Sequence, residues 1–144
     1  MAILAPKTLA IDQGADKTWP IYFFSPDPLG SGDLSLAAPL NLSGKNARLM
    51  IRVAQDYSSA LILSLLNTGA SPGLVFATGT SPGLPALATI LNPNGIKITI
   101  TKAQSLVMLA SQTGYYDMFF DDIASGISDL YMQGPFLVNA TVTR

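Results

Sequence analysis

Three aspartates, Asp117, Asp121 and Asp122, lie close together in the sequence and are the residues whose type and spacing could do chemistry. Two carboxylates with separated pKa values form a hydrolytic dyad. Asp121 and Asp122 with Asp129 and backbone carbonyls could hold Ca²⁺, although the spacing lacks the alternating acidic order of an EF-hand loop. Aspartate is also a common turn residue. We therefore favour solvated residues of a hairpin loop over a catalytic or metal site.

The sequence lacks most of the residues that nucleophilic catalysis needs. The chain has no histidine and no cysteine, which excludes Ser/His/Asp and Cys/His arrangements. A serine–lysine pair remains open because Ser105 follows Lys102 by three positions, but a solvated helix face is the interpretation we favour. The chain contains no G-x-x-x-x-G-K-[ST] phosphate loop. We predict no enzymatic activity, no catalytic residue, no cofactor and no metal.

Aromatic and arginine side chains offer an alternative, which is binding. A tyrosine-rich surface could form a platform for sugars, whereas a lone tryptophan on an alternating strand is typical of a core. Arg48 and Arg52 lie four apart on one strand face, where they would either contact carboxylates of a partner or remain solvated. The candidate interface residues are Trp19, Tyr22, Arg48, Arg52, Tyr116 and Tyr131.

The composition indicates a domain that needs partners. Its 144 residues suit one domain, and only 12% are charged against about 25% in an average soluble domain. The densest apolar run, residues 60–66, is far shorter than the roughly 20 residues of a membrane span, and the N-terminus lacks the order of a signal peptide. We therefore expect no membrane partner and favour assembly into a homo-oligomer, with a trimer as one option. A net charge of −1 argues against nucleic acid.

Strict alternation of apolar and polar residues predicts the clearest strands. It runs through NARLMIRV at 46–53 and IKITIT at 96–101. Thr101 and Gln104 match a capping box, which predicts a short helical turn after the second of these strands. The run 61–66 is apolar on both faces apart from Ser64, so we expect it to be covered on both sides.

Short strands at regular spacing predict an all-β, antiparallel β-sandwich, Ig-like or jelly-roll-like, with one short helical turn. We divide the chain into 1–45, an extended N-terminal arm with the first strands, and 46–144, the sandwich domain. Two SPG turns ten residues apart predict a hairpin inserted at 67–94. Pro20 predicts an edge strand or a bulged strand, and Gly134–Pro135 predicts a break between two C-terminal strands.

The order of these segments resembles a group of small bacteriophage virion proteins. The resemblance lies in LNLSGKNARLMIRVAQD, ALILSL, GIKITITKAQSLVML, GYYDMFFDD and LYMQGPFLVNATVTR, which together span residues 40–66 and 95–144. These segments are similar to tail-fibre, baseplate or connector-associated β domains, including the N-terminal domain of upper baseplate proteins. The stretch 67–94 departs from that pattern.

The resemblance implies a non-enzymatic virion structural protein, such as a short tail-fibre or collar component, assembled in the bacterial host cytoplasm. It implies partners among portal, adaptor or tail components besides copies of the chain itself. The alternative from the residues is a carbohydrate-binding adhesin that recognises a host surface glycan through its tyrosines. Symmetry, neighbour and position in a particle are not encoded in these patterns.

Overall fold

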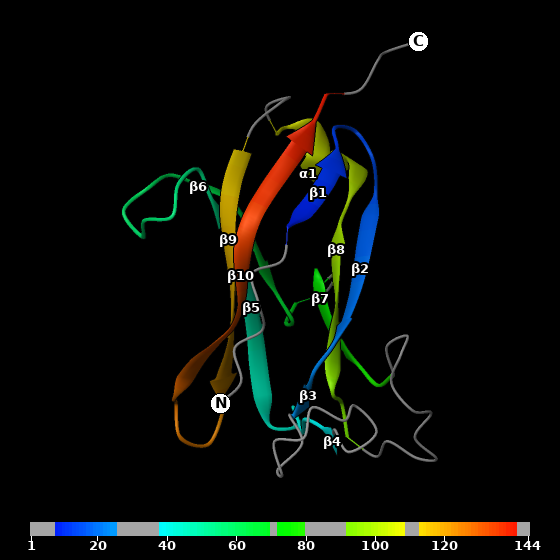
Figure 1. The fold of residues 1–144 in the computed structure, drawn as a ribbon, viewed down its shortest axis with the longest axis vertical. Helices are drawn as coiled ribbons and strands as arrows, with labels where there is room; N and C mark the ends of the chain where they lie inside the picture. The colour runs from blue at the N-terminus through cyan, green and yellow to red at the C-terminus, as the bar shows by residue number, and fades with distance from the viewer. Residues whose placement is uncertain (1–7, 26–37, 70–71, 80–91, 109–112, 141–144) are drawn as a thin grey trace, which may run out of the picture.

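Two β-sheets face each other across a hydrophobic core in the computed structural model (Figure 1). The structure describes residues 8–25, 38–69, 72–79, 92–108 and 113–140. One short helix, α1 (Lys102–Leu106), lies among the strands of these ranges. The strands are β1 (Leu9–Asp12), β2 (Lys17–Tyr22), β3 (Phe24–Ser25), β4 (Ala38–Pro39), β5 (Lys45–Arg52), β6 (Leu61–Leu66), β7 (Leu74–Ala77), β8 (Gly95–Ile100), β9 (Thr113–Asp122) and β10 (Ser128–Asn139).

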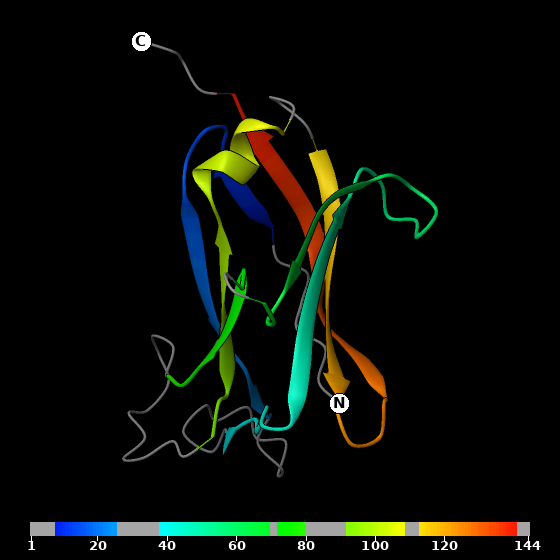
Figure 2. The same cartoon turned by 180° about the vertical axis from the view of Figure 1, so that it is seen from behind.

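The larger sheet has five strands in the order β1-β10-β9-β5-β6. β1 pairs with β10 in parallel, and the other neighbours are antiparallel. The β9–β10 hairpin closes near the pole opposite α1, and the β5–β6 connection projects away from the sandwich (Figures 1 and 2). This sheet carries the candidate interaction face.

The smaller sheet has three strands in the order β2-β8-β7, and β3 pairs with β4 beside it. β2 is an edge strand, as Pro20 predicts, because proline cannot donate a ladder hydrogen bond. β1 and β2 lie within the predicted segment 1–45, and they supply one strand to each sheet.

The strand order identifies the type of sandwich. β10-β9-β5-β6 in one sheet and β2-β8-β7 in the other follow the order of an immunoglobulin variable-type sandwich. The predicted all-β antiparallel sandwich is therefore confirmed, and the strand order is Ig-like. Immunoglobulin domains usually join the two sheets with a disulfide, but this chain contains no cysteine.

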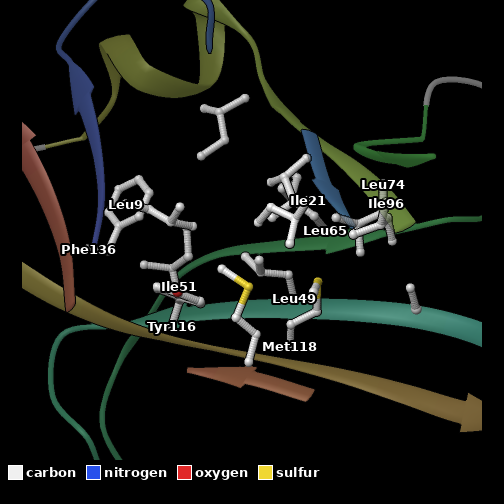
Figure 3. Packing of buried hydrophobic residues seen from close by; sticks show 14 of the residues in the cluster. Leu9, Ile21, Leu49, Ile51, Leu65, Leu74, Ile96, Tyr116, Met118 and Phe136 are labelled. Atoms are coloured by element: carbon white, nitrogen blue, oxygen red, sulfur yellow. The ribbon is translucent and has the colours of Figure 1, made fainter. Parts of the chain in front are cut away.

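In the described ranges, apolar side chains of both sheets pack against each other. Leu49, Ile51 and Met118 of the larger sheet point toward Ile21 and Ile96 of the smaller one (Figure 3). Aromatic rings add contacts between the sheets, and an edge-to-face arrangement is the favourable geometry for such pairs. Edge-to-face pairs join Trp19 of β2 to Phe136 of β10, and Phe23, which follows β2, to Phe120 of β9, whereas Phe120 and Tyr131 form such a pair within the larger sheet.

The capping box is confirmed at α1. The Thr101 hydroxyl accepts from the Gln104 backbone N–H, and the Gln104 side chain accepts from the Thr101 N–H. The buried Ser105 hydroxyl donates to the Ala15 carbonyl oxygen at 2.8 Å, which holds α1 against the β1–β2 turn. Ser105 therefore has a structural role, and the serine–lysine interpretation finds no support in its contacts.

Two expectations about strands are wrong. β10 runs unbroken through Gly134 and Pro135, both of which pair with β9. The irregularity of β10 lies elsewhere, at a register shift between Leu130 and Met132. β6 is an edge strand of the described sheet, and its Leu61 and Leu66 are exposed instead of covered on both sides. Of the predicted hairpin at 67–94, the structure describes β7, while residues 80–91 lie outside the described ranges.

Neighbouring phenylalanines on β9 test the assignment of the two faces. Phe120 is fully buried among Phe23, Phe76 and Tyr131, whereas Phe119 is half-buried on the opposite face. We expect Phe120→Ala to lower the free energy of unfolding by about 3–5 kcal/mol in urea titrations, because it leaves a cavity in the core. Phe119→Ala is the matched control and should cost less than about 1.5 kcal/mol. Equal losses for both variants would contradict the face assignment.

Candidate interaction face

The strand register brings twelve outward side chains of β5, β6, β9 and β10 into three rows. We call this set the outer face of the larger sheet. Its rows are Leu66, Arg48, Phe119 and Leu130; Ser64, Met50, Asp117 and Gln133; and Leu61, Arg52, Tyr115 and Pro135.

Apolar side chains dominate the outer face. The outward side of an antiparallel sheet in a sandwich is normally polar. Here seven of the twelve positions are apolar, among them Leu61 and Leu66 at 49% and 48% exposure and Tyr115 at 38%. Val53 and Tyr57, beside it on the β5–β6 connection, are also exposed. Water therefore meets an apolar surface where the fold would normally place polar groups.

Three charged residues lie within this apolar surface. Asp117 is opposite Met50 in the register, so Arg48 and Arg52 are its two diagonal neighbours. Burial raises the pKa of the Asp117 carboxyl above its ordinary value, and the charges of Arg52 and Arg48 offset only part of that rise. The carboxylate thus lies between two guanidinium groups in an environment that disfavours its charge.

Arg48 is held in place by its neighbours. Its Nε atom donates to Oδ2 of Asp121 at 3.1 Å, and its guanidinium lies 4.4 Å from the centroid of the Phe119 ring. Burial raises the pKa of Asp121, but hydrogen bonds from Ser128 and Arg48 outweigh this and lower it overall. Arg48 and Asp121 therefore form a structural ion pair at one end of the outer face.

Arg52 is held at the other end by weaker contacts. Its Nη1 atom donates to the Ser59 carbonyl oxygen at 3.3 Å, and its Nη2 atom to the Met50 sulfur at 3.4 Å. A Cβ atom at Gly114 would lie 2.6 Å from the Arg52 carbonyl oxygen, so glycine allows β9 to approach β5 closely here. The Arg52 guanidinium also lies 5.7 Å from the Tyr57 ring centroid.

A pocket of about 230 Å³ opens at this end of the outer face. The β5–β6 connection forms one wall of it, and β9 and β10 form the other. Two of the lining residues, Arg52 and Asp117, each also carry a buried atom, Nε and Oδ1 respectively, that has no hydrogen-bond partner among the described residues. A buried polar atom without a partner is costly to the folded state.

The other acidic residues near the hairpin serve the fold. Asp122 accepts hydrogen bonds from the backbone N–H groups of Ala124 and Ser125, and it lies 3.7 Å from Nζ of Lys45. Within the described ranges, no group of three or more metal-ligating side chains is close enough to hold an ion. Asp122 therefore has the structural role that aspartates have in turns, while Asp121 pairs with Arg48.

The six predicted interface residues separate into two groups. Arg48 and Arg52 lie on the outer face as their shared strand face predicts. Tyr116 and Tyr131 are buried, Trp19 packs against the core, and Tyr22 lies over Gly95 on the smaller sheet. We therefore leave these four aromatic residues out of the candidate face.

Sequence reasoning missed most of the outer face. Asp117, Phe119 and Tyr115 alternate with buried residues along β9, and this alternation was the available signal. The alternation alone did not show which side faces the core, because Tyr115 and Tyr116 are neighbours of the same residue type on opposite faces. Gln133 and Leu130 carried no signal at all, since only the register with β9 brings them beside Asp117 and Phe119.

Comparisons with known proteins give little guidance. No family model matches the chain, and no curated protein matches it. A solved structure of the extracellular domains of the voltage-gated sodium channel beta4 subunit matches over 99% of this chain and 98% of that chain, at 11% identity and a TM-score of 0.40. That protein forms parallel homodimers with a role in cell–cell adhesion. At this similarity neither family nor function transfers.

These findings correct the expectation of a virion structural protein. No family model and no curated protein connects the chain to a virion, and the solved structure reported above is of an extracellular domain. The virion location and the portal, adaptor and tail partners lose their support with it. The host-glycan alternative loses two of its tyrosines, because Tyr116 and Tyr131 are buried. The sequence resemblance itself stays a prediction that these comparisons do not address.

No helix within the described ranges has the length and apolar character needed to cross a membrane.

The pKa values of Asp117 and Asp122 are shifted in opposite directions, so substitution of each by asparagine should change the stability of the fold in opposite directions. A raised pKa in the folded state means that ionised Asp117 destabilises the fold above its folded pKa, and this penalty disappears below the unfolded value near 4. Asp117→Asn should therefore raise the free energy of unfolding at pH 7, and the gain should shrink as the pH falls toward 4. Denaturant titrations across this range measure it.

Asp122→Asn is the control with the opposite sign. Backbone hydrogen bonding from Ser125 is the largest cause that lowers the pKa of Asp122. The ionised form therefore stabilises the fold above the unfolded pKa, and the substitution should reduce stability at pH 7. A stability loss at pH 7 for Asp117→Asn would instead show that the Asp117 carboxylate is well paired in the folded protein, and would contradict the prediction.

Proposed function

We propose that this chain is a non-enzymatic protein-interaction domain that associates with a second copy of itself through the outer face. The observation that carries the proposal is the apolar character of seven of the twelve outward positions at the centre of the larger sheet. Large exposed apolar patches on soluble domains usually mark interfaces. The low charge content of the whole chain, 12%, agrees with burial of extra surface.

The charges of the outer face suit a copy of itself. Arg48 and Arg52 are balanced by Asp117 and by Asp121, which pairs with Arg48. A two-fold interface places the same patch on both sides, so any charges within the patch must be able to complement themselves, as a patch with both signs of charge can. We therefore favour a two-fold dimer over a trimer, since a trimer needs two different complementary surfaces.

The edge strand β6 of the larger sheet also favours the outer face as the interface. Natural edge strands are protected by lysine, proline or bulges. β2 carries Lys17 and Pro20, whereas β6 has neither a charged residue nor a proline in LILSLL, and its pairing with β5 is irregular only at its start, opposite Ile51 and Arg52. This weakly protected edge borders the apolar face, and a second copy on that face would cover the exposed Leu61 and Leu66.

A non-enzymatic role is supported by how the polar side chains are used. Asp121 forms an ion pair with Arg48, and Asp122 accepts hydrogen bonds in the hairpin turn. Ser105 holds α1 against the β1–β2 turn. These were the strongest candidates for chemistry in the sequence. We propose that none of them takes part in a reaction.

A charge placed on the outer face should disrupt association. We expect the native chain to form a dimer in sedimentation velocity, and Leu66→Lys to raise the dissociation constant at least about tenfold, which corresponds to about 1.4 kcal/mol. Each substitution acts twice in a two-fold interface. Val75→Lys is the matched control, because Val75 has the same 48% exposure but lies on β7 of the smaller sheet.

Three results would contradict the proposal. The first is a native chain that stays monomeric at millimolar concentration. The second is a dimer that Val75→Lys weakens as much as Leu66→Lys does. The third is a hexameric or trimeric native species, which would show that the contact is not two-fold.

A further inference from the structure

Asp117 lies near the centre of the outer face, and its carboxylate has no ion-pair partner among the described residues. It belongs to the middle row and to β9, which together with β5 forms the centre of the four strands, and it is half-buried. Within the described ranges the ion pairs join Lys45 to Asp122 and Arg48 to Asp121. An unpaired carboxylate in an apolar surface is less stable ionised than it would be in water.

The two arginines diagonal to Asp117 are held by other groups. Arg48 donates from Nε to Asp121, and Arg52 donates from Nη1 to the Ser59 carbonyl oxygen. Burial raises the pKa of the Asp117 carboxyl, and the charges of the two arginines offset only part of that rise. The arginines therefore attract the carboxylate from a distance but do not pair with it.

The other groups that face Asp117 supply no further positive charge. The β5–β6 connection contributes Asp56 and Tyr57 to the pocket that Asp117 also lines. β9 contributes Tyr115 on the same face, and β10 contributes the uncharged Gln133. In the described part of the chain, the positive charges around Asp117 are thus those of the two arginines.

A second copy on the outer face would place this carboxylate in a less favourable environment. The copy brings the same twelve outward side chains, whose charged members are Arg48, Arg52 and Asp117. Its arginines are held by their own contacts in the same way, so the copy removes water from Asp117 without supplying a free guanidinium. Desolvation disfavours the ionised form of a carboxyl group and leaves the neutral form less affected.

We propose that association of two copies through the outer face takes up a proton at each Asp117, so that the dimer becomes tighter as the pH falls. This inference rests on the proposed dimer. The proton comes from the solvent and neutralises the Asp117 carboxylate. Because proton uptake and association are linked, each favours the other, and acidification strengthens the contact.

The composition makes the range between pH 5 and pH 7 informative. The chain has no histidine, no cysteine and no glutamate, and its nine acidic residues are all aspartates. An aspartate of ordinary pKa, about 3.9, is ionised throughout this range. A change in association between these two pH values is therefore expected from a carboxyl group whose pKa is raised.

Sedimentation velocity of the native chain at pH 7 and pH 5, at one ionic strength, tests the proposal. We expect the dissociation constant of the dimer to be at least about fivefold lower at pH 5. Asp117→Asn should associate equally at both pH values, and at pH 7 it should associate more tightly than the native chain. Asp129→Asn is the control and should keep the pH dependence, because Asp129 pairs with Phe120 and lies outside the outward rows.

NMR of protein with ¹³C-labelled aspartate locates the proton directly. The carboxyl carbon of Asp117 should titrate at a higher pH in concentrated protein than in dilute protein, because dilution separates the copies. The carboxyl carbon of Asp122, which accepts hydrogen bonds in the hairpin turn, should titrate at the same pH in both samples.

A dimer whose dissociation constant is the same at pH 5 and pH 7, or higher at pH 5, would overturn this inference and leave the proposed dimer intact. The inference is also overturned if the pH dependence survives in Asp117→Asn, because the proton would then bind elsewhere. A chain that stays monomeric at both pH values would contradict the proposed dimer, and this inference with it.

Discussion

The antiparallel register of β5 against β9 is the constraint on which both faces of the larger sheet depend. Eight consecutive pairs, from Lys45 with Asp122 to Arg52 with Tyr115, fix which residues lie side by side. Because side chains alternate between the faces, a slip of one residue would exchange the core set with the outer set. The same register therefore buries Leu49 and Met118 and places Asp117 between two arginines.

The core of the sandwich is built from apolar and aromatic side chains of both sheets. With no cysteine in the chain, apolar and aromatic contacts replace the disulfide that usually joins the sheets of an Ig-like sandwich. Phe120 lies at the centre of these contacts, within 6 Å of the ring centroids of Phe23, Phe76 and Tyr131. The core residues and the outer face lie on opposite sides of the larger sheet, so a second molecule can cover the outer face without entering the core.

Local patterns predicted much of the fold. Alternation located β5 and β8, the capping box located α1, and Pro20 identified an edge strand, since each depends on residues close in sequence. The expected break at Gly134–Pro135 was wrong because β9 pairs with both residues and holds β10 in one strand. Tertiary pairing overrode the local signal there.

The candidate site was much harder to predict. Its rows combine four strands that are far apart in the sequence, so only the register brings Gln133 and Ser64 beside Asp117 and Met50. Arg48 and Arg52 were found because they share one strand. Tyr116 and Tyr131 were candidates by residue type, yet the pleat turns both rings into the core. Spatial neighbours on a sheet face cannot be read without the pairing of the strands.

The central claim is that the outer face is covered by a second copy, and a cysteine-free chain allows a direct measurement. A single Ser64→Cys substitution places a thiol in the middle row of the outer face, and Thr18→Cys places one on the exposed side of β2. We predict that alkylation of the thiol at position 64 by iodoacetamide slows as the protein concentration rises, while alkylation at position 18 does not change. Equal, concentration-independent rates at both positions would contradict a covered outer face.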